Sequence, residues 1–179
     1  MPDGMAGHAD VAAASSERVR EGVPAGSLRH LAVLFSGAPG RAVVEAVYAY
    51  EAELRRIVAA TSHEAAHARL QWWHGELDRL AAGRPSHPLA RALVPLHEVA
   101  NADPPLLREM LVAADLDLAR LTYVTRQELE AYLFRSCGAP QVLVASILAA
   151  GDGLSPAERN FARRLGAAVR QTEILFDLG

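Results

Sequence analysis

The sequence predicts a single all-α domain, and three observations support this fold class. Hydrophobic residues make up 51% of the 179 residues but aromatic residues only 6%, so alanine, leucine and valine supply most of the apolar content. Alanine and leucine have high helix propensity, whereas aromatic and β-branched residues favour strands. Apolar residues also recur at helical spacings along most of the chain, and helix-capping signatures separate these segments. The length fits one domain.

The first 26 residues differ from the rest of the chain. They are rich in alanine, glycine, serine and charged residues and show no apolar period. We therefore expect residues 1–26 to form a disordered or frayed tail, and residues 27–179 to form the helical domain.

Two helices are predicted at the start of the domain. Apolar residues from Leu28 to Phe35 indicate the first, and a Ser-Gly-Ala-Pro-Gly turn ends it. The second is predicted over Arg41–Ala60. Its main apolar stripe follows the spacing of one helix face and consists of Val43, Val47, Tyr50, Leu54 and Ile57.

Three further helices follow in the middle of the chain. Thr61 or Ser62 is expected to cap one that ends near Gly83. The next is expected over Leu89–Val99, and another from Pro104-Pro105 to about Leu121.

Capping boxes mark the last two helices. Thr125 and Glu128 begin a long apolar helix towards Ala150, which Pro140 is expected to kink. Ser155 and Glu158 begin the final helix. The chain therefore predicts a bundle of about seven helices.

The helix over Arg41–Ala60 carries a second stripe that contains an arginine. The stripe consists of Val44, Tyr48, Ala52, Arg55 and Ala59. Apolar residues on two sides indicate that this helix is central. A buried, unpaired charge is too costly to keep, so Arg55 either meets a carboxylate or an anionic ligand, or extends its guanidinium to solvent.

The segment His63-Glu64-Ala65-Ala66-His67 matches the HExxH pattern of zinc hydrolases. Two histidines four residues apart on a helix can share a metal ion, with the glutamate as general base. The motif lies in the first turn of its helix, and His74 lies two turns further along. The alternative interpretation is an exposed polar first turn in which Glu64 favours the helix N-terminus.

Composition excludes several classes of partner. A net charge of −3 does not indicate binding to nucleic acid. The longest apolar run, Val142–Ala150, is shorter than the roughly 20 residues of a membrane span. The single cysteine, Cys137, has apolar neighbours and is expected to be a packed thiol. We expect a cytoplasmic protein without a signal peptide or a membrane span.

Four stretches resemble the squalene/phytoene synthase family, the head-to-head prenyl transferases of the isoprenoid-synthase fold. YAYEAELRRIVA (Tyr48–Ala59) resembles its first aspartate-rich helix, and Arg69–Leu93 resembles its Trp-Trp segment and His-Pro turn. Asp115–Pro140 is similar to the stretch before the central pocket helix, and Leu165–Gly179 to the start of the second aspartate-rich helix. The resemblance implies an isoprenoid-synthase-like bundle that is truncated relative to the family.

In this family two aspartate-rich motifs hold magnesium ions, which bind the diphosphate of the prenyl donor and help it to leave. By this resemblance, Tyr48 matches the tyrosine of the first motif helix and Tyr132 matches a pocket tyrosine. The two aspartates of the first motif fall on Arg55 and Ala59, and Asp177 matches the first aspartate of the second motif.

The exchange of aspartate for arginine opposes magnesium binding. Unit charges 4 Å apart interact by roughly 4 kcal/mol at a dielectric constant of about 20, so both the lost attraction and the new repulsion act against the ion. We therefore expect no cofactor, no metal ligands and no catalytic residues. The candidate binding pocket consists of Tyr48, Arg55, Tyr132 and Asp177, and Arg55 is expected to pair with Asp177.

Three functions follow as hypotheses. The first is a non-catalytic or metal-independent relative that acts by binding or assembly, as in the branch of the family that includes a mitochondrial complex I assembly factor. The second is a prenyl transferase-type enzyme acting on farnesyl or geranylgeranyl diphosphate, with Arg41, Arg55 or Arg170 neutralising the diphosphate. The third is a zinc hydrolase. Expected partners are a prenyl diphosphate or another apolar ligand, and a protein partner or second copy covering an open apolar groove.

Overall fold

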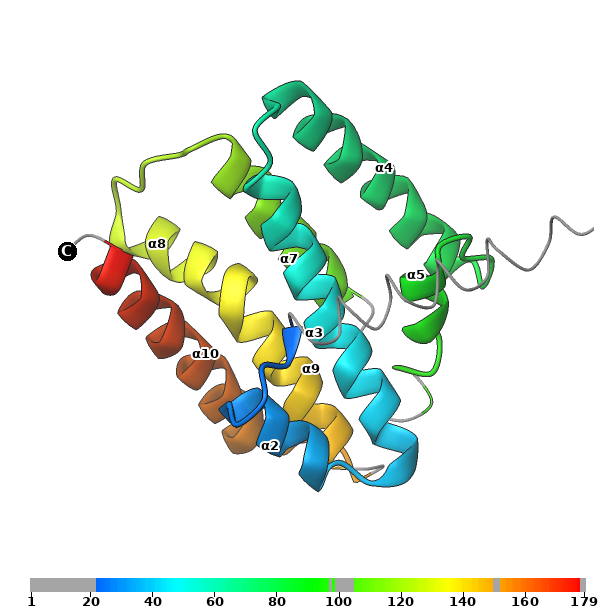
Figure 1. The fold of residues 1–179 in the computed structure, drawn as a ribbon. Helices are drawn as coiled ribbons and strands as arrows, with labels where there is room; N and C mark the ends of the chain where they lie inside the picture. The colour runs from blue at the N-terminus through cyan, green and yellow to red at the C-terminus, as the bar shows by residue number, and fades with distance from the viewer. Residues whose placement is uncertain (1–21, 97, 99–104, 150–151, 178–179) are drawn as a thin grey trace, which may run out of the picture.

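The computed structural model describes residues 22–177 except 97, 99–104 and 150–151 (Figure 1). The helices are α2 (Leu28–Phe35), α3 (Ala38–Val58), α4 (His63–Ala81), α5 (Pro88–Ala92), α7 (Pro105–Leu118), α8 (Arg126–Leu133), the π-helical turn η1 (Phe134–Gly138), α9 (Ala139–Leu148) and α10 (Pro156–Asp177). Since α8, η1 and α9 run on as one helix, the described residues hold seven helices and no strand. The predicted all-α bundle is confirmed.

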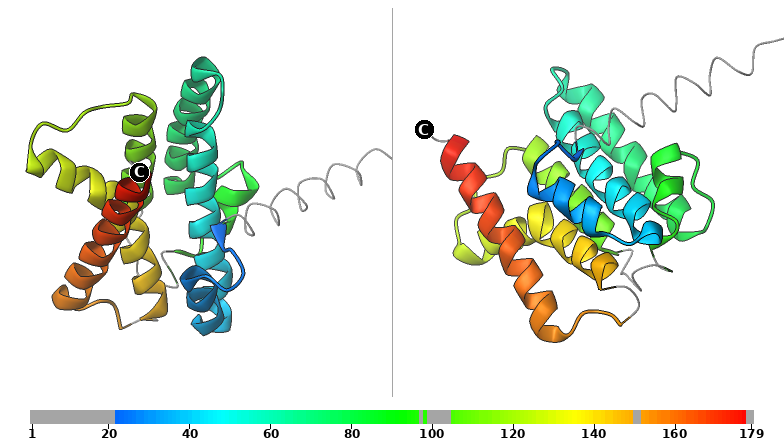
Figure 2. Two further views of the ribbon diagram at one scale, coloured as in Figure 1. Left: turned by 60° about the vertical axis from the view of Figure 1, so that its left-hand side comes forward. Right: turned by 60° about the horizontal axis from the view of Figure 1, so that its bottom comes forward.

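Helix α3 lies at the centre of the bundle and contacts α2, α4, α5, α7 and α9. Seen from the side, α3 and α4 form one layer and α8, α9 and α10 form another (Figure 2). Helix α7 packs against members of both layers. The central position predicted for α3 is therefore confirmed.

The main stripe of α3 forms much of the core. Val47, Tyr50 and Ile57 are fully buried, and the Tyr50 ring meets the ring of Trp73 from α4 edge-on with 5.0 Å between centroids. The second stripe is buried at Val44 and Tyr48 but emerges into solvent towards its end.

The capping signals place several helix ends correctly. The Ser62 hydroxyl accepts a hydrogen bond from the Ala65 N–H at the start of α4. Thr125 and Glu128 form the predicted capping box, and Ser155 and Glu158 make the same reciprocal hydrogen bonds.

Two helix limits differ from the prediction. Helix α3 begins at Ala38, not Arg41, because a proline fits the first turn of a helix, where its missing N–H has no intrahelical partner. The helix predicted over Leu89–Val99 is interrupted: the short α5 is followed by turns at residues 93–95, and Leu96 and Glu98 are helical again beside residues outside the described part of the chain. Most of the predicted N-terminal tail, residues 1–21, also lies outside the described residues.

The π-helical turn η1 takes the place of the predicted kink at Pro140. The Ala139 N–H donates to the Phe134 carbonyl, five residues earlier, so the helix widens before the proline that cannot donate. Helix α10 crosses this turn at Gly166, where a Cβ atom would lie 2.3 Å from the Cys137 carbonyl oxygen. The crossing therefore requires a residue without a side chain.

One stretch of the described chain, Arg126–Leu148, is long and apolar enough to cross a membrane. Most of it is buried in the bundle, between α3, α7 and α10. It is a core helix of this fold.

Candidate functional site

Six charged side chains from four helices form a continuous set of ion pairs, which we call the ion-pair chain. Its members, in order of contact, are Arg29 (α2), Glu51 and Arg55 (α3), Glu173 and Arg170 (α10) and Asp117 (α7). Three arginines face three carboxylates, so the formal charges of the chain sum to zero.

Glu51 is the most buried member of the ion-pair chain. Its Oε1 accepts from Arg29 Nη2 at 2.8 Å and from Arg55 Nη2 at 2.7 Å. Its Oε2 is buried and has no hydrogen-bond partner among the described residues. Buried polar atoms are rarely left in this state, so the second oxygen calls for an explanation.

The two arginines at the other end of the chain bridge α3, α7 and α10. Arg55 Nη2 lies 3.5 Å from a carboxylate oxygen of Glu173, and Arg170 Nη1 lies 3.1 Å from the same atom. Burial lowers the pKa of Arg55, but the carboxylates of Glu51 and Glu173 outweigh it, so the pKa is raised. Both guanidiniums therefore stay charged.

Tyr132 supports Arg170 from α8. Its hydroxyl donates to Asp117 Oδ1 at 2.7 Å and accepts from Arg170 Nη2 at 2.6 Å. Burial and the hydrogen bond to Asp117 raise the pKa of Tyr132, so the hydroxyl stays protonated at neutral pH. The hydroxyl oxygen therefore already donates one hydrogen bond and accepts another.

The thiol of Cys137 lies 4.0 Å from Arg55 Nη2 and is buried, as the sequence predicts. Burial, together with the negative charges of Glu51 and Glu173, raises the pKa of this thiol to about 11. The thiol is therefore protonated at neutral pH and is a poor nucleophile.

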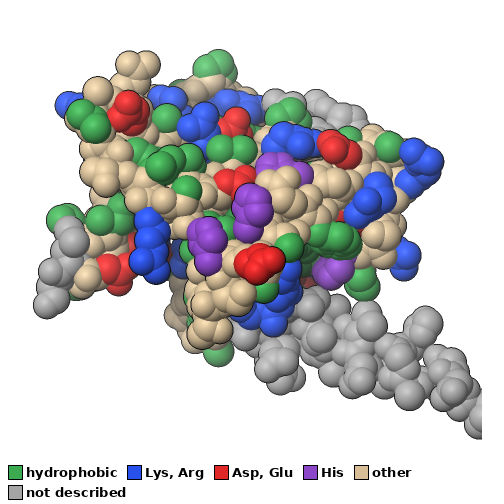
Figure 3. Space-filling view, turned by 90° about the horizontal axis from the view of Figure 1, so that it is seen from above, with side chains coloured by type: hydrophobic (Ala, Val, Ile, Leu, Met, Phe, Trp, Pro, Cys, Tyr) green, Lys and Arg blue, Asp and Glu red, His purple; other side chains and the backbone are tan. Residues whose placement is uncertain are grey.

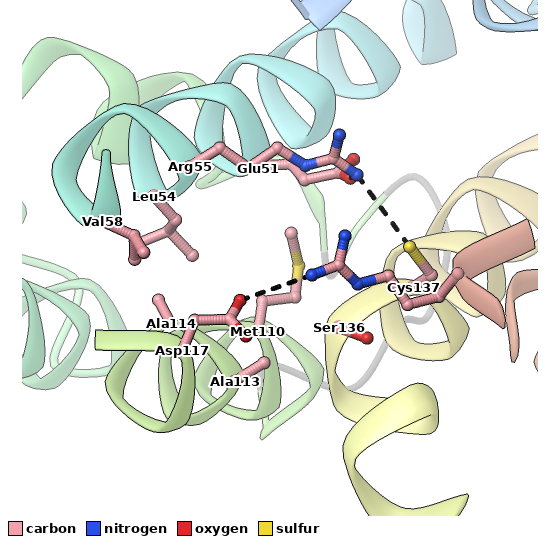
Figure 4. A pocket seen from close by; sticks show the side chains of 11 residues that line it. Glu51, Leu54, Arg55, Val58, Met110, Ala113, Ala114, Asp117, Ser136 and Cys137 are labelled. Carbon is pink, nitrogen blue, oxygen red and sulfur yellow. Dashed lines mark hydrogen bonds and ion pairs between the residues drawn. The ribbon is translucent and has the colours of Figure 1, made fainter. Parts of the chain in front are cut away.

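A small cavity of about 100 Å³ lies within the ion-pair chain. Its polar lining consists of Glu51, Arg55, Asp117, Ser136 and Arg170, and its remaining walls come from Cys137 and from apolar residues of α3 and α7 (Figure 4).

A larger apolar groove of about 790 Å³ lies between α2, α3, α9 and α10. Its lining includes Leu28, Tyr48, Val144, Leu148, Phe161, Leu165 and Val169. Arg29 also lines it, with the guanidinium 4.8 Å from the centre of the Tyr48 ring. The volume and the apolar walls are those of a typical ligand site.

The predicted pocket residues do not all meet. Tyr48 lines the groove, Arg55 lines the small cavity, and Tyr132 holds the Arg170 and Asp117 side chains. The predicted pairing of Arg55 with Asp177 is wrong, because Arg55 pairs with Glu51 and Glu173. Asp177 is exposed one helical turn beyond Glu173, about 6 Å further along α10.

Arg55 both contacts carboxylates and reaches solvent, which are the two alternatives that the sequence analysis left open. Its side chain is 48% exposed, and it still contacts two carboxylates. Sequence reasoning missed Glu51 as its nearest partner. The signal was present, because a glutamate four residues before an arginine is a favourable helical pair.

The residues of the ion-pair chain do not fit a magnesium site. Among the described residues, no group of three or more His, Cys, Asp or Glu side chains is arranged to hold a metal ion. The carboxylates that face the small cavity already bind arginines, and a guanidinium from Arg55 stands beside them.

The HExxH segment lies on the surface. His63, Glu64 and His67 are exposed in the first turns of α4, while His74 bonds to Asp115 with 2.7 Å between Nε2 and Oδ2. Histidines lie among arginines and acidic residues on the face seen from above in Figure 3. Within the described part of the chain, no third ligand completes a zinc site.

These features define an all-α protein of the isoprenoid-synthase type, and the comparisons with known proteins agree. The sequence matches the squalene/phytoene synthase family over residues 24–179, so the chain belongs to this family.

Two known proteins are similar to this chain. The chain is 30% identical to the 15-cis-phytoene synthase of Synechocystis sp. over 119 residues, which cover 62% of this chain and 35% of that protein. Its fold is similar to the squalene synthase HpnC from Alicyclobacillus acidocaldarius, with a TM-score of 0.68 and 22% identity over 88% of this chain and 59% of that one. The chain thus spans about a third to three fifths of the length of these relatives.

Proposed function

We propose that this protein binds a long apolar chain of the isoprenoid type and does not condense prenyl diphosphates. The observation that carries the proposal is the ion-pair chain, in which Arg55, the residue that by the family resemblance replaces a metal-binding aspartate, is paired with carboxylates. The groove supplies the apolar site. The relatives are named for the synthesis of phytoene and squalene, which are long apolar isoprenoids.

Loss of a diphosphate group requires stabilisation of the negative charge that grows on the leaving oxygen, and in metal-assisted reactions a cation supplies it. In the ion-pair chain every arginine already contacts a carboxylate, so the set offers little uncompensated positive charge. This balance supports binding without ionisation of the ligand.

The direct test is incubation of the protein with farnesyl or geranylgeranyl diphosphate, with and without magnesium. We expect no condensation product, and an affinity for the apolar chain that magnesium does not change. Formation of a condensation product with magnesium would favour the alternative, a prenyl transferase-type enzyme, for which the 30% identity to a phytoene synthase is the supporting observation.

The groove itself is tested by a charge on its wall. Leu165→Asp places a carboxylate in the apolar lining and should lower the affinity for the chain at least about tenfold, because the charge must lose water when the ligand enters. Leu175→Asp is the matched control on the same helix, since Leu175 is 70% exposed and is not part of the groove lining. An equal loss of affinity in both variants would contradict the assignment of the groove as the binding site.

A second copy or another protein is the competing occupant of the groove. Large apolar side chains beside it are exposed, among them Leu28 at 84% and Phe161 at 69%. Light scattering separates the two cases, because a complex that buries the groove would change in mass when Leu165→Asp is introduced.

A further inference from the structure

We infer that a second copy of this chain covers the open side of the apolar groove, so that the ligand site is complete only in the dimer. This inference rests on the proposed function, because it requires the groove to hold an apolar chain. It adds the partner that shields this chain from water. In this arrangement the second copy covers the groove and does not fill it.

The groove is open to solvent along one side. Helix α9 lies between α2 and α10 and forms its floor (Figure 2). Large apolar residues from all three helices line the groove and are nevertheless exposed, namely Leu28, Leu148, Phe161, Leu165 and Val169. A ligand site of this kind buries roughly 70–90% of its ligand. A long apolar chain in the open groove would keep one side in water, so the site requires a cover.

Helix α2 extends the exposed apolar surface beyond the groove. Phe35 follows the groove-lining residues Leu28 and Ala32 by seven and three positions, so its side chain leaves the same side of the helix. Phe35 is 82% exposed and is not part of the groove lining. We call the whole exposed surface the apolar rim, and its members are Leu28, Leu31, Phe35, Leu148, Phe161, Leu165 and Val169.

The size of the apolar rim fits a stable interface. From their exposed fractions, its seven residues present on the order of 700 Å² to solvent. The largest apolar patch of a typical monomer is roughly 300–600 Å². Each partner in a stable complex buries about 800 Å². The rim alone therefore comes close to the area that a second copy needs.

The charges that border the apolar rim carry both signs. Arg41, which donates to a backbone carbonyl of α2, and Arg164 on α10 are positive. Glu45 on α3 and Glu158 on the groove wall are negative, while Arg29 on the same wall is held in the ion-pair chain. A surface that meets its own copy must be self-complementary, and this balance avoids repulsion between two identical faces. A rim of one sign would instead fit a partner of the opposite charge.

A second copy that covers the groove and one that fills it respond to a ligand in opposite ways. If the second copy covers a bound ligand, the ligand strengthens the dimer and the dimer strengthens ligand binding, since such coupling is reciprocal. If the second copy fills the groove, the ligand displaces it. The effect of the ligand on the dimer therefore separates these two cases.

The test is analytical ultracentrifugation of the unmodified protein over a range of concentrations, with and without farnesol. We expect a species of twice the 19.2 kDa of one chain. Farnesol should lower the dissociation constant of the dimer at least about tenfold. A dimer that farnesol weakens would overturn the inference, because the second copy would then fill the groove.

Two variants assign the dimer to the apolar rim. Phe35→Asp should raise the dissociation constant of the dimer at least about tenfold, because the new carboxylate would lose water in the interface. It should also weaken farnesol binding, although Phe35 does not line the groove. Phe176→Asp on α10 is the matched control, since Phe176 is 80% exposed and lies outside both the rim and the groove lining. Both side chains are exposed, so neither change should affect folding.

The outcomes distinguish this inference from the proposed function. A monomer that binds farnesol, or a dimer that Phe35→Asp and Phe176→Asp weaken equally, would overturn the inference and leave the proposed function intact. A monomer that sediments with phosphatidylcholine vesicles and loses this property in Phe35→Asp would assign the rim to a lipid surface instead. A dimer that binds no farnesol would contradict the proposed function and, with it, the inference.

Discussion

Two buried glutamates on neighbouring helices, Glu76 and Glu51, differ in how their oxygens are used. Both oxygens of Glu76 on α4 are occupied: Oε1 accepts from the backbone N–H groups of Ser86 and His87, and Oε2 from the Ser86 hydroxyl and Arg79, all at 2.7 Å. On α3, by contrast, only Oε1 of Glu51 has partners in the described part of the chain.

This difference separates a carboxylate whose hydrogen bonds are all made from one whose hydrogen bonds are half made. Glu76 fastens the Ser86-His87 turn to α4, and its side chain is completely buried. Glu51 lines the small cavity, and its Oε2 is buried without a hydrogen-bond partner in the described part of the chain. A buried acceptor that is fully satisfied stabilises the fold, whereas one that is half satisfied leaves part of its desolvation cost uncompensated.

The largest expected effect is that of Glu76→Ala. The substitution removes a buried carboxylate and four hydrogen bonds, from the backbone N–H groups of Ser86 and His87, the Ser86 hydroxyl and Arg79, so the free energy of unfolding should fall by about 3 kcal/mol or more. Urea denaturation measures it. Asp78→Ala on the same helix is the control, because Asp78 is 70% exposed in its pair with Arg108 and should cost less than about 1 kcal/mol.

The crossing of α10 over η1 should be the next most sensitive place. Gly166→Ala introduces a Cβ atom 2.3 Å from the Cys137 carbonyl oxygen, and we expect a loss of about 1–3 kcal/mol in thermal or urea unfolding. In Gly75→Ala the nearest atom is 3.7 Å away, so the same change should stabilise α4 by about 0.5–1 kcal/mol. Similar effects in both variants would argue against a tight crossing.

Low pH should weaken the attachment of the Ser86-His87 turn to Glu76, which we call the Glu76 anchor, over a defined pH range. Burial alone would raise the pKa of Glu76, but hydrogen bonds from His87, Ser86 and Arg79 lower it to about 2. The contribution is fully present above the unfolded pKa of about 4.3 and is lost as the pH falls towards about 2. The unfolding free energy of Glu76→Ala should fall less steeply over this range, and an identical slope would count against the anchor.

Apart from the control variants, the smallest expected effect on stability is that of Glu51→Gln, which tests the comparison of the two glutamates directly. Arg29 and Arg55 are 24% and 48% exposed and keep contact with water when the charge is removed, so we expect a cost of about 1 kcal/mol. A loss as large as that of Glu76→Ala would show that Glu51 is a structural residue.

Helix limits and caps were predictable because their signals are local. Thr125 and Ser155 were assigned as caps from spacing alone, and each makes the expected hydrogen bond; of the two candidates Thr61 and Ser62, Ser62 is the cap. The apolar stripe of α3 predicted the core in the same way. The second stripe of α3 indicated from spacing alone that Arg55 needs a charged partner or contact with solvent.

The contacts within the candidate site could not be predicted from residue spacing alone. Matching by sequence named Asp177 as the partner of Arg55, but the crossing of α10 at Gly166 brings Glu173 to α3 and leaves Asp177 exposed. The π-helical turn before Pro140 could not be predicted from the sequence either, since a kink and a widened turn both accommodate the missing N–H of the proline.

The amino-acid order alone therefore determined the helical class and most helix ends, and through the family resemblance it led to the expectation that Arg55 replaces a metal ligand. Tertiary packing decided which carboxylates meet that arginine and which oxygen of Glu51 stays without a donor. The reason is physical: capping and periodicity act within one or two helical turns, whereas an ion pair between helices depends on crossing points that shift by one turn, about 5.4 Å, with the choice of a single small residue.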